Sequence, residues 1–124
     1  MPSSVIDGSV FEFERLDVYH VSLEFYDLAR EIIRELPKGY AEESDQLKRA
    51  ALSIMLNICE GAGEFSPAEK ARFFRMALRS ATECAALLKL FQHDVGETEE
   101  MKQAVTLLLR LVAMLTALVT RLQA

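Results

Sequence analysis

The sequence is short of the residues that build loops, disulfide frameworks and metal sites. Its 124 residues include three prolines, five glycines, no tryptophan, two cysteines and two histidines. So few prolines and glycines exclude a loop-rich fold and a long disordered region. With 51% hydrophobic and 27% charged residues the composition is that of a globular protein, and a chain of this length forms one core. A single, mostly helical domain is therefore expected.

The few cysteines and histidines form no metal or redox motif. Cys59 and Cys84 lie in apolar, helical surroundings without a Cys-x-x-Cys pair, which predicts two buried free thiols. A di-iron bundle uses Glu-x-x-His on two helices. The nearest match is Asp17-x-x-His20, and His93 lacks an acidic residue three positions earlier. We therefore predict no bound metal and no cofactor.

Motifs of catalysis and targeting are missing as well. The chain has no nucleophile elbow, phosphate-binding loop or dinucleotide fingerprint, which predicts a non-enzymatic protein. The net charge of −5 argues against a general nucleic-acid binder, which usually has a basic balance. The first dozen residues lack the basic and apolar segments of a signal peptide. We expect a cytoplasmic protein with a flexible segment at 1–12 and one domain at 13–124.

Apolar residues three and four positions apart predict the first two helices. The first ends at Pro37-Lys38-Gly39, where proline lacks a backbone donor and glycine permits a turn. The second begins after Ser44 as N-cap, and Gly61 and Gly63 are candidates for its end because glycine adopts the left-handed conformation that closes many helices. The stripes expected to face the core are Leu16, Tyr19, Leu23, Tyr26, Ala29, Ile33 and Leu36 in the first helix, and Leu47, Ala50, Ala51, Ile54 and Ile58 in the second.

The third helix has the clearest start. Ser66 is its predicted N-cap, Pro67 occupies the first helical position, and Glu69 is placed to complete a capping box. Gly96 and Thr98 mark the next break, with Thr98 capping the fourth helix. Four helices with short connections predict an all-α, antiparallel up-down-up-down four-helix bundle. The seam of the third helix, which continues to about His93, consists of Phe73, Phe74, Ala77, Ala81, Cys84, Leu87, Leu88 and Phe91.

The fourth helix is apolar on every side. From Ala104 to Val119, AVTLLLRLVAMLTALV contains a single charge, Arg110. A helix in a monomeric bundle needs only one apolar stripe. A transmembrane helix needs about 20 apolar residues and disfavours a central arginine. Partner helices from other subunits explain the composition better, so we predict a homo-oligomer.

A basic strip is expected on the third helix. Arg72, Arg75 and Arg79 are spaced i, i+3 and i+7, with Lys70 nearby. One interpretation is a nucleic-acid site, because guanidinium groups match phosphate oxygens and a ring would repeat the strip in every subunit. The other is a solvated face with salt bridges from Arg72 to Glu69 and from Arg79 to Glu83.

Polar residues interrupt the apolar second helix. Ser53, Asn57 and Glu60 fall on one face, and Ser80 and Glu83 are neighbours on the third helix. Buried polar groups need partners, so the spacing predicts a polar network that holds helices or subunits in register. The alternative is that Asn57 and Glu60 line a ligand or nucleic-acid site. Close approach of backbones at the end of this network is the role predicted for Gly61 and Gly63.

Two stretches carry a resemblance to a known family: FERLDVYHVSLEFYDLA and LKRAALSIMLNICEGAGEFSPAEKARFFRMALRSATE. They resemble the four-helix-bundle family named for proteins encoded in intervening sequences of bacterial 23S ribosomal RNA genes, often labelled S23 ribosomal protein. The resemblance runs from about Phe11 to the C-terminus and includes an Asn-Ile-x-Glu-Gly signature. The matching residues are Phe13, Leu16, Val18, Arg49, Ala50, Ala51, Ser53, Ile54, Asn57, Ile58, Glu60, Gly61, Gly63, Phe73, Ala77, Ser80 and Glu83.

The resemblance implies a pentameric ring. It also implies a fold similar to the accessory variability protein of diversity-generating retroelements, a basic pentamer that works with a reverse transcriptase and binds nucleic acid. This chain departs from the family pattern at Met55 and Leu56, where a proline and a serine are common, and at Arg79, where glycine is frequent. The first departure predicts a straighter helix with a stickier exposed side, and the second adds to the basic strip.

Together these features predict a non-enzymatic, homo-oligomeric scaffold or accessory protein, pentameric by resemblance, in RNA- or DNA-associated processes. The alternative is a protein–protein interaction adaptor with no nucleic-acid role, which the negative net charge favours. The sequence names neither the partner nor the cargo.

Overall fold

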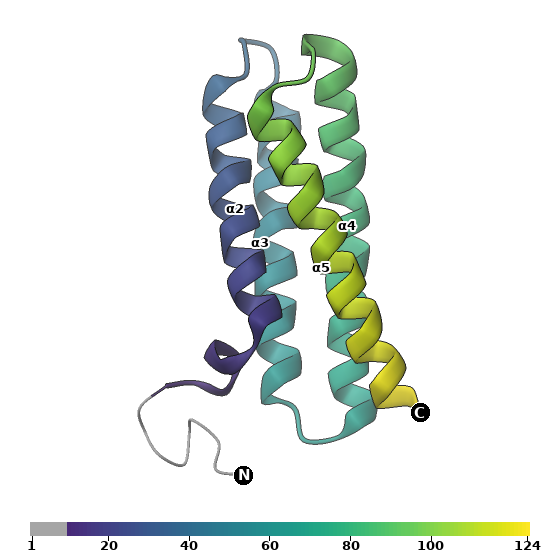
Figure 1. Cartoon of the computed structure of the whole chain (residues 1–124). Coiled ribbons are helices and arrows are strands. Elements are labelled where there is room, and N and C mark those ends of the chain that lie inside the picture. The colour runs from purple at the N-terminus through teal and green to yellow at the C-terminus, as the bar shows by residue number, and fades with distance from the viewer. Residues whose placement is uncertain (1–9) are drawn as a thin grey trace.

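The computed structural model describes residues 10–124, and four long helices make up most of this part (Figure 1). Successive helices run in opposite directions, so α2 and α4 point one way and α3 and α5 the other. In the described chain no Cα atom of α2 lies within 8 Å of one in α4, and these two helices stand at opposite corners. The predicted all-α, up-down-up-down four-helix bundle is confirmed. The elements are the 3-10 helix η1 (Glu12–Arg15) and the α-helices α2 (Asp17–Glu35), α3 (Ala41–Gly63), α4 (Pro67–Val95) and α5 (Glu99–Gln123).

The predicted flexible segment at 1–12 is only partly described. Residues 1–9 lie outside the described residues, whereas Glu12 already belongs to η1. The backbone N–H of Phe11 donates to Glu14 Oε1 at 2.7 Å, which caps this short helix. Regular structure therefore begins one residue before the predicted boundary.

The starts of α4 and α5 follow the predicted capping residues. Ser66 Oγ accepts from the Glu69 N–H at 3.0 Å with Pro67 at the first helical turn, and Thr98 Oγ1 accepts from the backbone N–H three residues on at 3.1 Å. The second half of the predicted capping box is wrong, because the Glu69 carboxylate pairs with Arg72 instead. These caps satisfy backbone donors that the first turn of a helix cannot satisfy itself.

The predicted ends of α3 need correction. The helix begins at Ala41 after Tyr40, so Ser44 lies inside the first turn and its N–H donates to the Tyr40 carbonyl. At the other end, α3 closes through Glu64 in an extended conformation. Among the described glycines only Gly39 and Gly96 have positive φ, in the α2–α3 and α4–α5 connections. Gly61 and Gly63 therefore do not close the helix by left-handed geometry.

The core-facing stripe of α2 is also different from the predicted one. Only Ala29 of the predicted set is buried, and Leu23 is 37% exposed. Most buried residues lie one position before a predicted one, as Phe25 lies before Tyr26, and one position corresponds to a rotation of about 100° around the helix. Because α2 carries apolar groups on two adjacent faces, sequence spacing did not separate them. The tyrosines of the predicted set, Tyr19 and Tyr26, are only partly buried and pack against the edge of the core. The buried side chains are Val18, Val21, Ser22, Phe25, Ala29 and Ile32.

The core between the helices is filled by aromatic and branched side chains. The predicted stripe of α3 is buried throughout, and so is that of α4 except for Phe73, which is only partly buried because its ring lies under the exposed Arg72 guanidinium. Full burial of one large apolar side chain stabilises the folded state by about 1.5–3 kcal/mol. The largest fully buried side chains are Phe25, Ile32, Leu47, Ile54, Ile58, Leu88, Phe91, Leu111 and Leu115.

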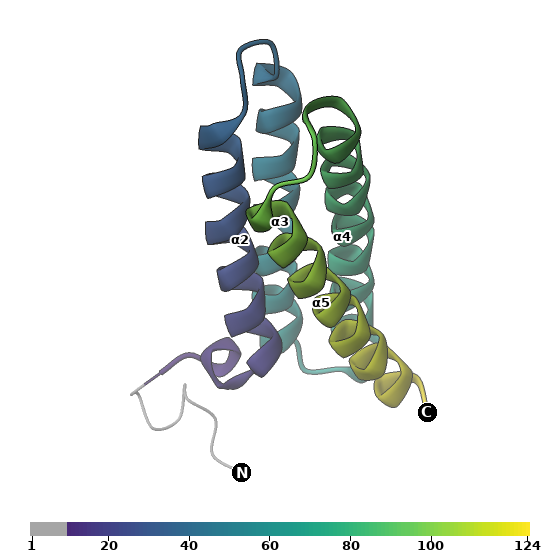
Figure 2. The ribbon, with the colours of Figure 1, turned by 45° about the horizontal axis from the view of Figure 1, so that its top comes forward.

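The axis of α5 is inclined to the other three helices. It starts beside the end of α2 and crosses the bundle, so that its C-terminus lies beyond α4 (Figures 1 and 2). By length and composition alone α5 could span a membrane, and only 22% of its most apolar stretch is buried in the bundle. The complete helix has 25 residues and is therefore longer than the apolar run from Ala104 to Val119 on which the expectation against a membrane span rested. What covers the outer side of α5 decides its role.

Candidate functional site

Three of the five residues predicted to form a polar network meet between α3 and α4. Asn57 Nδ2 donates to the Ser53 carbonyl at 2.9 Å and to Ser53 Oγ at 3.1 Å, and Ser80 Oγ donates to Ser53 Oγ at 2.9 Å. Glu60 and Glu83 are exposed and have no hydrogen bond to this cluster in the described chain. The serine pair links two helices and fixes their relative height. The structure thus brings together the neutral residues of the predicted set and not the acidic ones.

The end of α3 fits closely against the start of α4 at Gly61. A Cβ at this position would lie 2.7 Å from Phe74 Cε1 and 3.2 Å from Phe73 Cβ. A Cβ at Gly63 would meet no heavy atom within 4 Å. Close approach inside the described chain therefore concerns Gly61 alone, and it is an approach of side chains to backbone.

Lys70 lies at this corner and not in the basic strip. Its Nζ donates to the Ala62 carbonyl at 3.0 Å and to the Gly61 carbonyl at 3.4 Å. These carbonyls belong to the last turn of α3, where a cation satisfies free acceptors and the negative end of the helix dipole. Lys70 is therefore occupied in closing α3.

The three predicted arginines are exposed along the outer side of α4. Arg72 is held by Glu69, with Nη2 3.0 Å from Oε1, and its guanidinium lies 4.5 Å from the centre of the Phe73 ring. The hydrogen bond to Glu69 raises the pKa of Arg72 further. The predicted ion pair between Arg79 and Glu83 is not formed in the described chain. Arg75 and Arg79 are thus the freely available cations of the strip.

An apolar surface extends along the outer side of α5. Leu109 is 67% exposed, and Ala113 and Ala117 follow it one and two turns later, also exposed. The ten residues from 111 to 120 contain no charged side chain on any face of the helix. Beside them, Leu109 and Val112 line a mostly apolar groove of about 200 Å³ between α4 and α5. A contiguous exposed apolar strip of this kind is typical of a surface that contacts a protein or membrane partner.

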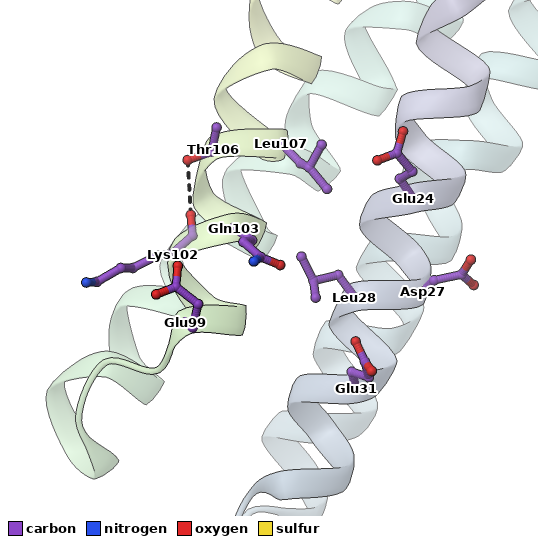
Figure 3. Close-up of a pocket in the computed structure, with 9 residues that line it drawn as sticks. All are labelled: Glu24, Asp27, Leu28, Glu31, Glu99, Lys102, Gln103, Thr106 and Leu107. Atoms are coloured by element: carbon purple, nitrogen blue, oxygen red, sulfur yellow. Dashed lines mark hydrogen bonds between the residues drawn. The ribbon is translucent and has the colours of Figure 1, made fainter.

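A second groove of about 540 Å³ lies between α2 and α5, and it is acidic (Figure 3). Leu28 of α2 and Leu107 of α5 point toward each other across it, and Glu24 and Glu31 lie on either side of Leu28. Four carboxylates and one lysine line the groove, so the negative charge is in excess. This surface was not predicted, although the acids of α2 at positions 24, 27 and 31 repeat the spacing of the arginines.

One exposed aromatic side chain was also missed. Phe65, in the α3–α4 connection, is 98% exposed. It precedes the N-cap Ser66, where an apolar residue often packs against the fourth helical residue. Here that residue is Lys70, whose Nζ is directed at α3, so Phe65 has no apolar partner of this kind. The sequence indicates this exposure, because Phe65 precedes the N-cap Ser66 while Lys70 occupies the position of its usual apolar partner.

Both cysteines are free thiols, but only Cys84 is buried. Burial, with a smaller effect from Glu83, raises the pKa of the Cys84 thiol to about 12. Burial and then Glu60 also raise the pKa of Cys59, which is half-buried. Both thiolates are therefore scarce near neutral pH, which disfavours nucleophilic chemistry at either residue.

The histidines have local partners. His20 Nε2 lies 2.7 Å from the Glu14 carbonyl, and His93 Nδ1 lies 3.0 Å from Asp94 Oδ1. Asp94 also accepts from the Tyr40 hydroxyl at 3.1 Å, and the bonds to His93 and then Tyr40 lower the pKa of Asp94. In residues 10–124 there is no group of three potential metal-ligating side chains from histidine, cysteine, aspartate and glutamate.

Comparisons with known proteins agree with this architecture. One solved structure, described as a protein of unknown function from the S23 ribosomal protein family of Bacteroides thetaiotaomicron, is 24% identical with a TM-score of 0.74. The match covers 82% of this chain and 97% of that one, and it shows the shared fold. A search of curated proteins finds no match. The model of the 23S rRNA-intervening sequence protein family matches residues 14–117. The chain therefore belongs to the 23S rRNA-intervening sequence protein family.

Proposed function

We propose that the protein is a non-enzymatic scaffold that assembles with copies of itself through the outer side of α5. The observation that carries this proposal is the charge-free stretch at 111–120, of which only one face is buried in the bundle. Its core-facing stripe is already complete without the outer residues. Exposed apolar area costs about 25 cal/mol per Å² relative to burial, so a second surface of this kind favours association.

Membership of a family with a four-helix fold supports a closed assembly. Most soluble homo-oligomers have closed symmetry, and the family resemblance favours five subunits in a ring. A ring of rigid bundles would present the same side chains at regular intervals. Such an assembly suits a scaffold that holds partners in place, in the cytoplasm, without bound metal or cofactor.

The test is the mass of the untagged protein in solution, by sedimentation velocity and native mass spectrometry over a range of concentrations. Ala113→Glu with Ala117→Glu places two charges on the outer side of α5 and should give monomers that keep the helical circular dichroism. Ala41→Glu with Ala68→Glu is the matched control, because both alanines are exposed and lie in the first turns of α3 and α4, outside the apolar side of α5. A wild-type protein that stays monomeric at high concentration would overturn the proposal.

Nucleic-acid association is a second candidate. It is favoured by the exposure of Arg72, Arg75 and Arg79 on one side of α4, and by a family description that names 23S rRNA. It is weakened by the engagement of Lys70 with α3 and of Arg72 with Glu69. Without nucleic acid, the same scaffold would be a protein–protein adaptor.

Fluorescence anisotropy with a labelled single-stranded RNA and an RNA duplex separates these two. Binding that falls steeply with salt and is lost in Arg75→Ala with Arg79→Ala would support the candidate. Arg30→Ala with Arg34→Ala, on the exposed side of α2, is the control. If the wild-type protein binds neither RNA even at low salt, the nucleic-acid candidate is wrong and the protein–protein adaptor remains.

A further inference from the structure

We propose that the arginine strip of α4 (Arg72, Arg75 and Arg79) docks onto the acidic α2–α5 groove of a second copy of this chain. The inference rests on the proposed self-assembly and names the surfaces that meet in it. Both surfaces are exposed in the single chain. They carry opposite charge, and complementary charge fixes the choice and orientation of partners.

The two charge patterns match in spacing. Glu24, Asp27 and Glu31 of α2 occupy positions i, i+3 and i+7, as do the three arginines of α4. With a rise of 1.5 Å per residue, the outer members of each strip are separated by about 10 Å along the helix axis. Strips of equal length and opposite sign can therefore pair side chain by side chain along two packed helices.

The charges of both strips are available for a partner. Glu24 and Glu31 have no hydrogen bond or ion pair with another described residue, and neither have Arg75 and Arg79. The strip faces outward from α4, whereas three of the four groove carboxylates belong to α2, which stands at the opposite corner of the described bundle. The strip therefore cannot reach the groove of its own chain. Only a second molecule can bring the two surfaces together.

The geometry of the surfaces selects a head-to-tail contact. A two-fold contact centred on either surface would place groove against groove or strip against strip, and the like charges would repel. A two-fold contact that paired strip with groove twice would need both surfaces on one side of the chain, whereas α2 and α4 stand at opposite corners. Contact of strip with groove uses different surfaces on the two copies, and such contacts generate rings when the rotation closes. The groove also offers an apolar floor in Leu28 and Leu107, onto which the hydrocarbon stems of the arginines can pack.

Charge reversal tests the pairing in the full-length chain. Arg72→Glu with Arg79→Glu reverses the outer members of the strip and should weaken self-association at least about tenfold, and Glu24→Lys with Glu31→Lys should do the same. Arg75 and Asp27 stay unchanged, so the four substitutions combined restore opposite charge at all three paired positions and should return association to near the wild-type level. Arg34→Glu with Lys48→Glu is the control, because it changes the net charge as the strip variant does but lies outside both surfaces.

Sedimentation velocity at low and high salt measures the self-association of every variant, and circular dichroism checks that each variant is folded. Rescue by the fourfold variant supports the pairing, since a folding defect would not be rescued. If wild type assembles and the strip variant assembles equally well, the inference is wrong while the proposed scaffold stands. If that variant keeps its assembly but loses RNA binding, the strip is a nucleic-acid surface and the inference is equally wrong. A monomeric wild type would remove both proposals.

Discussion

Replacing Gly61 by alanine adds a methyl group where α4 leaves no space. The new Cβ would lie 2.7 Å from Cε1 and 3.0 Å from Cδ1 of the Phe74 ring. Carbon atoms in contact prefer separations of about 3.5–4.0 Å. Phe74 is only 3% exposed, so its ring cannot swing into solvent to make room. Either the ring or the end of α3 must shift.

The magnitude follows from two opposed effects. Overpacking a well-filled core costs about 1–3 kcal/mol. Alanine gains up to about 1 kcal/mol over glycine inside a helix, and less near its end. Gly63→Ala is the matched control, because it lies in the same helix and its Cβ would have no neighbour within 4 Å. The free energies of unfolding of the two variants should therefore differ by about 1–3 kcal/mol, with Gly61→Ala the less stable.

Urea unfolding followed by circular dichroism measures this difference, with all variants at one protein concentration because assembly shifts apparent stability. Gly61→Ala combined with Phe74→Leu removes part of the ring and should recover stability relative to the sum of the single changes. Equal stability of Gly61→Ala and Gly63→Ala would refute the close-packing argument. So would an absence of coupling between positions 61 and 74.

Three further predictions concern single interactions. Ser66→Ala removes the N-cap of α4 and should lower the free energy of unfolding by about 1 kcal/mol; no change in urea unfolding would contradict the cap. A double-mutant cycle of Ser53→Ala and Ser80→Ala should show a coupling of about 0.5–1.5 kcal/mol, and independent effects would deny that their hydroxyls interact. Because burial raises the pKa of Cys84 to about 12 from about 9, the stability it contributes is complete below pH 9 and is lost between pH 9 and 12. The stability difference between wild type and Cys84→Ala should therefore shrink by about 1 kcal/mol from pH 8 to pH 10, and a constant difference would count against the burial effect.

Local sequence was sufficient where one residue decides the structure. Ser66 and Thr98 cap α4 and α5 because a side-chain oxygen at a helix start has an immediate backbone partner. The predicted core-facing stripe of α2 was wrong because helical periodicity fits two faces equally well. One face carries Tyr19 and Leu23, and the other, which is the buried one, carries Val21 and Phe25. Which face turns inward depends on neighbouring helices, and these are not encoded within the segment.

The candidate surfaces show the same limit. Spacing placed Ser53, Asn57 and Glu60 on one face of α3, but Glu60 is exposed and makes no hydrogen bond to the cluster that Ser53 and Asn57 form with Ser80. The role of Lys70 depends on the turn that brings the end of α3 beside it. Contacts between helices thus required the fold, whereas the apolar excess of the last helix was evident from composition.

The corner between α3 and α4 has a consequence for the order of folding. Lys70 reaches carbonyls eight and nine residues earlier in the chain, and Phe74 packs against Gly61, thirteen positions before it. Contacts so close in sequence close small loops at little entropic cost and form early. The hairpin of α3 and α4 is therefore the natural folding nucleus, while α2 and α5, which contact each other across most of the chain length, join later. Of the four helices α5 is synthesised last, so its apolar outer side is the last of their surfaces to emerge from the ribosome.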